Sequence, residues 1–91
     1  MPDFLPEQAP TVREMALGDE LSLFDTATGT ALALNGTARD VWALVDGHSP
    51  VEDIVATLAA SYRVDPARID GDVRAAVAAL TAAGVLIAPT P

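Results

Sequence analysis

The side chains that could take part in catalysis or metal binding are few and scattered along this chain. The single histidine, His48, lies in a predicted turn, and one imidazole without a partner makes neither a metal site nor a catalytic pair. Two carboxylate pairs, Glu52 with Asp53 and Asp70 with Asp72, are close enough in sequence for acid–base or metal chemistry. Each pair lies near the start of a predicted helix, where negative charge interacts favourably with the helix dipole. We therefore expect no catalytic residue, no metal and no cofactor, and hence no enzymatic activity.

Length and composition predict one small cytoplasmic domain. The chain has 91 residues, enough for one thin hydrophobic core. It has no cysteine, which excludes disulfides and thiolate chemistry and fits a reducing compartment. Residues 1–7 lack the basic and apolar regions of a signal peptide, and no segment has the roughly 20 apolar residues that a membrane span needs. We expect no membrane partner.

The charge of the chain argues against a nucleic-acid partner. The formal net charge is -8, and all five basic residues are arginine. Proteins that bind nucleic acids concentrate basic residues on one face, because neutralising phosphates supplies much of the affinity. The acidic surface keeps the protein soluble and would attract a basic peptide or protein.

Proline content and apolar periodicity divide the chain. Residues 1–10 hold three of the seven prolines, and their apolar residues show no periodic pattern. We divide the chain into an extended arm, one domain and a tail, at residues 1–10, 11–88 and 89–91. Over residues 11–34 apolar residues recur with period two in three pieces, which are separated by turn residues at 18–19 and 25–29. This pattern predicts a three-stranded antiparallel meander.

After Asn35 the apolar period changes to 3.6, which predicts three helices. Asn35 can cap the first helix by accepting a backbone N–H, and Gly47 lies just beyond its end. The segment Ser49-Pro50-Val51-Glu52 has the form of a capping box with proline at the first helical position, so the second helix begins there. Asp65-Pro66 begins the third helix in the same way, and Gly84 ends it.

A last short strand can follow over residues 85–87. The predicted fold class is therefore α+β, a three-stranded antiparallel β-meander followed by a three-helix bundle, in a winged helix-turn-helix-like arrangement.

The third predicted strand, over residues 30–34, is an edge strand that continues into the first helix. A peptide could add to this edge as a fourth strand, with alternate side chains entering a groove between the strand and a helix. The third helix suits the groove wall, because it mixes larger apolar residues with small alanines. In the alternative interpretation Val73, Val77 and Leu80 simply pack against the first two helices.

A set of short motifs over residues 20–88 resembles the PqqD family. The motifs occur together in the order of that family: Leu34-Asn35-Gly36-Thr37-Ala38, Val41-Trp42, Asp46-Gly47, Ser49-Pro50-Val51-Glu52-Asp53-Ile54, Asp72-Val73 and Gly84-Val85-Leu86. Members of the family are recognition elements for ribosomally made, post-translationally modified peptides. They bind the leader segment of a precursor peptide and present its core to a modifying enzyme.

The resemblance implies that a leader peptide adds to the third strand and that its side chains lodge against the third helix. The strand contacts it implies are Thr30, Ala31, Leu32, Ala33 and Leu34. The helix contacts it implies are Asp72, Val73, Arg74, Ala76, Val77 and Leu80, with Asp72 and Arg74 as polar contacts.

The resemblance leaves two branches of the family as alternatives for this chain. The combination of Asn-Gly-Thr-Ala and Val-Trp in a free-standing, arginine-rich and lysine-free chain is most similar to the leader-binding subunit of a split lasso-peptide maturation protease. Its implied partner is a separate cysteine protease subunit that removes the leader. The alternative is a PqqD-type chaperone that delivers its precursor to a radical SAM enzyme.

A winged-helix DNA-binding domain is a third hypothesis, because three helices and a hairpin also describe that fold. Such a domain should carry basic residues on its third helix. The predicted third helix offers only Arg68 and Arg74 against Asp65, Asp70 and Asp72. Charge therefore disfavours DNA as a partner.

Overall fold

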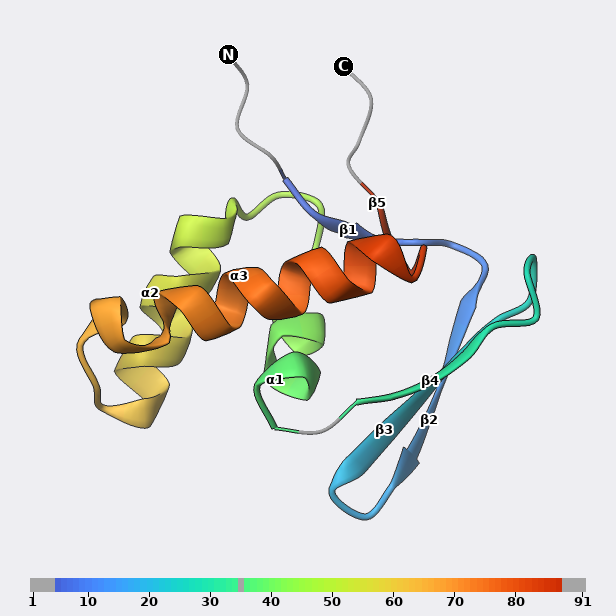
Figure 1. Cartoon of the computed structure of the whole chain (residues 1–91), viewed down its shortest axis with the longest axis horizontal. Coiled ribbons are helices and arrows are strands. Elements are labelled where there is room, and N and C mark those ends of the chain that lie inside the picture. Colours follow the sequence, from blue (N-terminus) through green and yellow to red (C-terminus); the bar gives the residue numbers. More distant parts are fainter. Residues whose placement is uncertain (1–4, 35, 88–91) are drawn as a thin grey trace.

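The computed structural model of the chain describes residues 5–34 and 36–87, and Asn35 with its proposed cap lies outside them. The elements follow in this order: β1 (Glu7–Gln8), β2 (Val12–Leu17), β3 (Glu20–Asp25), β4 (Ala31–Leu34), α1 (Gly36–Leu44), α2 (Val51–Tyr62), α3 (Pro66–Ala82) and β5 (Leu86–Ile87). The predicted α+β class, with a meander followed by three helices, is thereby confirmed (Figure 1).

The three-stranded sheet has the order β2-β3-β4, and both neighbouring pairs are antiparallel. Gly18 lies in the turn between β2 and β3 with a φ of +61°, a left-handed conformation that glycine adopts without steric cost. Along β3, Leu21 and Leu23 are buried while Phe24 is exposed, and Leu34 of β4 is buried on the same face as the two leucines. One face of the sheet thus packs on the helices, and the other is open.

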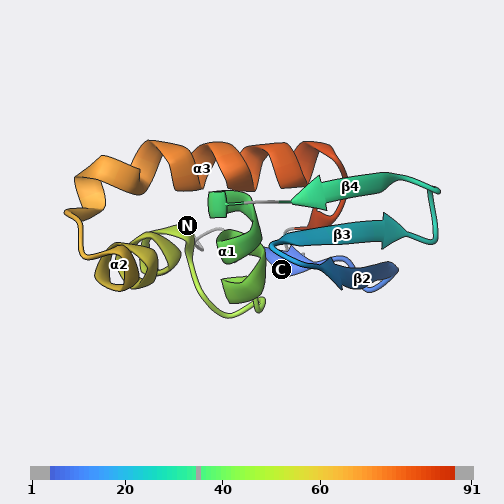
Figure 2. The same cartoon turned by 90° about the horizontal axis from the view of Figure 1, so that it is seen from below.

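Helix α3 joins the two ends of the molecule, because it runs from α2 at one end to the strands at the other (Figure 2). Helix α2 is capped at its C-terminus by Arg63, which has a left-handed backbone and whose N–H donates to the carbonyls of Ala59 and Ala60. The core combines side chains from the sheet and from all three helices, and its most buried members include Leu23, Leu34, Val41, Trp42, Ile54, Val73 and Leu80. Sheet and helices therefore share one core.

One of the two predicted proline caps is present and the other is not. At α3, the side chain of Asp65 accepts a hydrogen bond from the N–H of Ala67 (2.9 Å), with proline at the first helical position, as predicted. The capping box predicted for α2 is wrong, because Pro50 itself is the N-cap and makes no side-chain bond. The Ser49 hydroxyl instead donates to Asp46 in the preceding turn (3.2 Å).

The segment before β2 packs onto the domain. Strand β1 pairs antiparallel with β5, which is the short final strand that the sequence suggested. The carbonyl of Pro6 accepts from Gly47 N–H (2.9 Å), and the N–H of Ala9 donates to Val85 (2.9 Å). The Gln8 side chain donates to the carbonyl of Trp42 (3.0 Å). The described part of the predicted arm is extended, but it lies against the loops that flank α2 and α3.

The loop between β3 and β4 is organised by the buried carboxylate of Asp25. It accepts hydrogen bonds from the Thr11 hydroxyl (2.7 Å) and from the N–H of Ala27 (2.9 Å). These bonds lower the pKa of Asp25 from its ordinary value. The carboxylate thus fixes the turn from which β4 starts.

We expect Asp25→Asn to lower the melting temperature at pH 7, because an amide oxygen accepts weaker hydrogen bonds than a carboxylate. The pKa of Asp25 is lower in the folded state, so its stabilisation is complete above the unfolded-state pKa, roughly 4, and is lost as the pH falls through the folded-state value. Thermal unfolding followed by circular dichroism should show the difference from the wild type shrinking toward acidic pH. Glu14→Gln, at an exposed site of β2, is the control. A difference that stays constant with pH would contradict the assignment.

Candidate functional site

Strand β4 is an edge strand, and its register shows which backbone groups face outward. The N–H of Asp25 donates to the carbonyl of Thr30 (2.9 Å), and the same register pairs Leu23 with Leu32 and Leu21 with Leu34. Hydrogen-bonded and non-bonded pairs alternate in an antiparallel ladder. The bonded pairs therefore contain Thr30, Leu32 and Leu34.

The residues between them, Ala31 and Ala33, belong to the non-bonded pairs, so their N–H and C=O groups point away from β3 toward the free edge. Thr30 was also predicted to offer free backbone groups, but its N–H is held by the Thr28 hydroxyl (3.2 Å) and its carbonyl accepts from Asp25. Two of the five predicted strand residues thus direct their backbone groups to this edge, where no described residue pairs with them.

The α3 residues named by the sequence fall into three groups around the helix. Val73, Val77 and Leu80 are 0%, 6% and 2% exposed and belong to the hydrophobic core. In the structure they hold α3 in place, as the alternative interpretation of the sequence suggested, and their contact with a peptide stays a prediction. Of the other three, Arg74 lies on one flank of α3, which the Val77 side chain also reaches, and Asp72 and Ala76 lie on the opposite flank.

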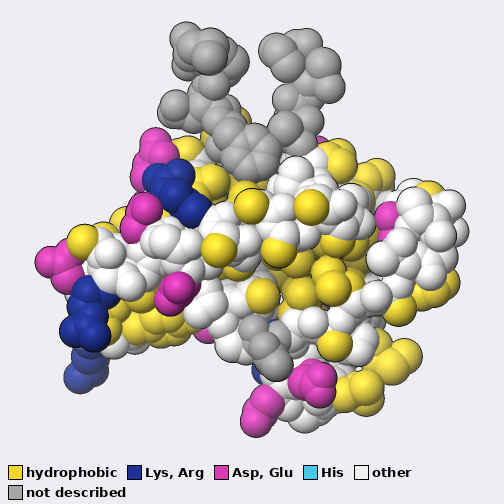
Figure 3. Space-filling model, viewed as in Figure 1, with side chains coloured by type: hydrophobic (Ala, Val, Ile, Leu, Met, Phe, Trp, Pro, Cys, Tyr) yellow, Lys and Arg dark blue, Asp and Glu magenta, His cyan; other side chains and the backbone are white. Residues whose placement is uncertain are grey.

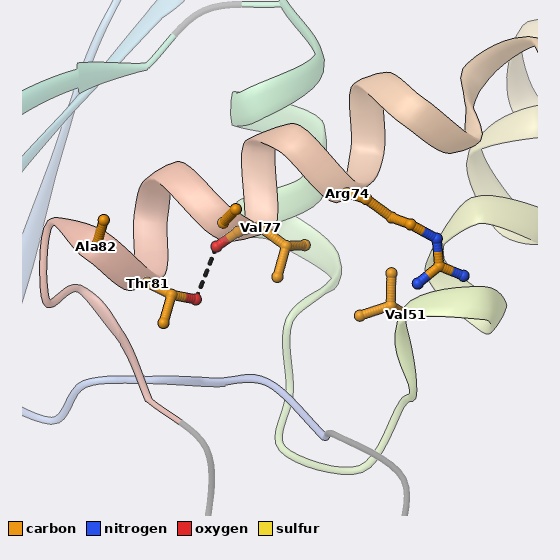
Figure 4. Close-up of a pocket in the computed structure, with 6 residues that line it drawn as sticks. Val51, Arg74, Val77, Thr81 and Ala82 are labelled. Carbon is orange, nitrogen blue, oxygen red and sulfur yellow. Dashed lines mark hydrogen bonds between the residues drawn. The ribbon is translucent and has the colours of Figure 1, made fainter.

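One flank of α3 carries Arg74 and Val77. They help to line a cavity of about 500 Å³, here called the rear pocket, whose lining residues are Val51, Arg74, Val77, Ala78, Thr81 and Ala82. In Figure 4 the side chain of Thr81 points to the side of α3 along which β1 runs, the side chains of Val51 and Arg74 lie between α2 and α3, and β4 lies on the other side of α3. The Arg74 Nε is held by both oxygens of Asp70, at 3.0 and 3.1 Å. Arg74 and Val77 therefore face away from the free edge of β4.

The opposite flank carries Asp72 and Ala76, which lie between about 120° and 160° around the helix from Ala78, at 3.6 residues per turn. Ala79 and Ala83 continue this flank toward the end of the helix that lies beside β4. Figure 3 shows hydrophobic side chains gathered on the surface between α3 and the strands. The sequence interpretation counted Ala79 among the small residues of the groove wall but omitted Ala83, although its spacing of seven residues from Ala76 is a helical one.

The open face of the sheet carries exposed hydrophobic side chains that the sequence interpretation also missed. Met15, Leu17 and Phe24 are 62%, 60% and 47% exposed. They share this face with Ala31 and Ala33, because the register places all five opposite to the buried leucines. The alternation Arg13-Glu14-Met15-Ala16-Leu17 would have shown which side of β2 was apolar.

Among the described residues, the buried indole Nε1 of Trp42 has no hydrogen-bond partner, whereas the Tyr62 hydroxyl has one. The Tyr62 hydroxyl at the end of α2 donates to the carboxylate of Asp40 on α1. Burial, with a further contribution from this bond, raises the pKa of Tyr62 to about 12.

Within residues 5–34 and 36–87, no three His, Asp or Glu side chains come together as metal ligands. None of the helices in these ranges combines the length and apolar character needed to cross a bilayer.

A comparison with protein families identifies the chain. Residues 20–86 match the family model of coenzyme PQQ synthesis protein D (PqqD). The chain belongs to the PqqD family. No curated protein gives a significant match.

Two solved structures share the fold of this PqqD-family chain. TbiB1 in complex with the TbiA(beta) leader peptide superimposes with a TM-score of 0.78 at 26% identity, covering 93% of this chain and 99% of that chain. A lasso peptide synthetase B1 complexed with the leader peptide superimposes with a TM-score of 0.74, also at 26% identity, covering 91% and 98%. Both similar chains were thus solved with a leader peptide bound.

We expect Leu80→Ala to lower the free energy of unfolding by about 2–5 kcal/mol, because it opens a cavity in the core of this PqqD-family domain. Ala79→Gln, at the neighbouring exposed position, should change it by about 0.5 kcal/mol or less. Urea unfolding followed by circular dichroism measures both. Equal effects of the two substitutions would contradict the division of α3 into buried and exposed positions.

Proposed function

We propose that this protein is a non-catalytic recognition element that captures the leader of a ribosomally made precursor by adding it as a strand to the free edge of β4. The observation that carries the proposal is the outward direction of the Ala31 and Ala33 backbone groups beside a flank of α3 built from small residues. Backbone pairing supplies affinity in strand addition, and the pockets for alternate side chains supply sequence choice.

The leader strand extends the sheet next to α3. Its inward side chains lie over Leu32 and the alanines of α3, while Asp72 at the rim is available to a basic or hydroxyl side chain. Leucine and alanine side chains leave room for apolar leader residues of medium size. The two similar structures, each with a bound leader peptide, support the same ligand class for this chain.

The downstream partner in this proposal is the cysteine protease subunit of a lasso-peptide pathway. The similarity to a lasso peptide synthetase B1 favours this branch over delivery to a radical SAM enzyme. The open sheet face with Met15, Leu17 and Phe24 supports a docking step, because an added leader strand would widen the same face. We place the assembly in the cytoplasm, where the precursor is made.

The substitution Ala33→Pro should weaken binding of the leader by about tenfold or more, because proline removes one outward donor while the ladder to β3 keeps its bonds. The probe is a fluorescein-labelled leader of the lasso precursor encoded beside this gene, titrated by fluorescence anisotropy. Ala33→Ser keeps the N–H and is the matched control, with affinity close to that of the wild type. Equal affinities for the proline and serine variants would exclude strand addition at β4.

The double substitution Met15→Ser, Phe24→Ser should leave the leader affinity unchanged and slow leader removal by the protease subunit, because it removes apolar area from the open face alone. Anisotropy and a cleavage assay, each with the full precursor, separate the two steps. Thr57→Ala, an exposed change on α2, is the control. Unchanged cleavage by the double variant would assign the docking step to another surface.

A further inference from the structure

The groove between α1 and α2 has no role in strand addition, because none of the described residues that line it belongs to β4 or α3. It is a cavity of about 240 Å³, here called the α1–α2 groove, and in Figure 2 α1 lies between α2 and the strands. Its apolar lining consists of Ala43 and Leu44 of α1 and Leu58 of α2. Leu58 is buried and Leu44 is half-buried, so the two leucines provide a floor on which an aliphatic chain can lie.

The polar side chains that line the α1–α2 groove are the carboxylate of Asp40 and the hydroxyls of Thr57, Ser61 and Tyr62. The Tyr62 hydroxyl donates to Oδ2 of Asp40, which leaves Oδ1 for another donor. Burial raises the pKa of Tyr62 to about 12, so this hydroxyl stays protonated at neutral pH and the negative charge of the pair belongs to Asp40. No described arginine forms an ion pair with Asp40. The groove therefore holds a negative charge that the described part of the chain does not neutralise.

We propose that the α1–α2 groove receives a lysine or arginine side chain of the protein to which the leader is delivered. The aliphatic stem of that side chain lies on Leu44 and Leu58, and its charged head donates to Oδ1 of Asp40. Long basic side chains commonly bury their methylene groups on apolar surface while the charge stays near water. The hydroxyls of Thr57 and Ser61 add further acceptors for the donors of an ammonium or guanidinium group.

A side chain presented by a protein fits the α1–α2 groove better than a free amine does. The cavity is smaller than the roughly 300–1,000 Å³ of pockets that enclose small molecules. A single ion pair near a protein surface is too weak to hold a small cation by itself, whereas within a larger interface it contributes specificity and a faster association. The net charge of -8 likewise favours a partner with a basic contact surface. The choice of this partner rests on the proposed function.

Two substitutions test this contact, with the cysteine protease subunit encoded beside this gene as the probe in isothermal titration calorimetry. Asp40→Asn removes the charge and keeps an oxygen that can accept from Tyr62. Ser61→Lys, at an exposed position, places an ammonium group of this chain in the groove, where it competes with the partner. The matched controls are Glu52→Gln and Ala60→Lys, which change the charge equally at exposed positions of α2 outside the lining of the groove. Circular dichroism checks that all four variants fold.

We expect Asp40→Asn and Ser61→Lys each to weaken binding of the protease subunit about tenfold relative to the matched control, because each removes the ion pair in the groove. The affinity for the labelled leader, measured by anisotropy, should stay unchanged in all four variants. If either groove variant binds the protease subunit as its control does, or also loses leader affinity, the groove contact is overturned and strand addition at β4 is not. If the unsubstituted protein binds the leader but not the protease subunit, delivery to that protease is overturned together with the groove contact.

Discussion

The register between β3 and β4 is the constraint on which the rest of the structure depends. It places Leu32 and Leu34 opposite Leu23 and Leu21, so the apolar side chains of both strands meet the helices. The same alternation directs the backbone groups of Ala31 and Ala33 to the free edge. A shift by one residue would expose the leucines and turn the free donors inward, so core burial and edge chemistry are fixed together. The burial of two leucines thus sets which residues direct their backbone groups to the free edge.

The faces of helix α3 have different roles in this arrangement, since one is buried in the core and two flanks lie beside β4 and α2. Val73 and Leu80 are the buried stripe that holds the helix on α1 and the sheet. Because the stripe is rigidly packed, the flank with Ala76 and Ala79 keeps its position beside β4, and the flank with Arg74 keeps its position beside α2. Substitutions in the buried stripe therefore alter both flanks through stability, whereas alanine positions on one flank can be changed separately. The flank beside β4 and the flank beside α2 can accordingly be examined independently.

Much of this fold was predictable from local sequence patterns, and the remainder depends on contacts between distant segments. The period-two pieces, the change to period 3.6 and the Asp65-Pro66 cap depend on neighbours in sequence, so the meander and helices followed from them. The pairing of β1 with β5 joins residues about eighty positions apart, which no local pattern specifies. Ser49 had a capping-box sequence, but Asp46 in the preceding turn competes for its hydroxyl. At the site, the edge strand was predictable, whereas the division of α3 into flanks required knowing which side meets α2.

An edge strand that accepts a peptide must be rigid enough to pair and yet must avoid pairing with other copies of itself. The Asp25 turn fixes one end of β4, and the direct entry into α1 restrains the other, so little backbone entropy remains to be lost when a strand is added. The strand has only four residues, which limits the ladder that two copies could form. The net charge of -8 adds repulsion between copies, and a basic or neutral peptide would not meet this repulsion. Short length and acidic charge together therefore favour a foreign strand over a second copy at the same edge.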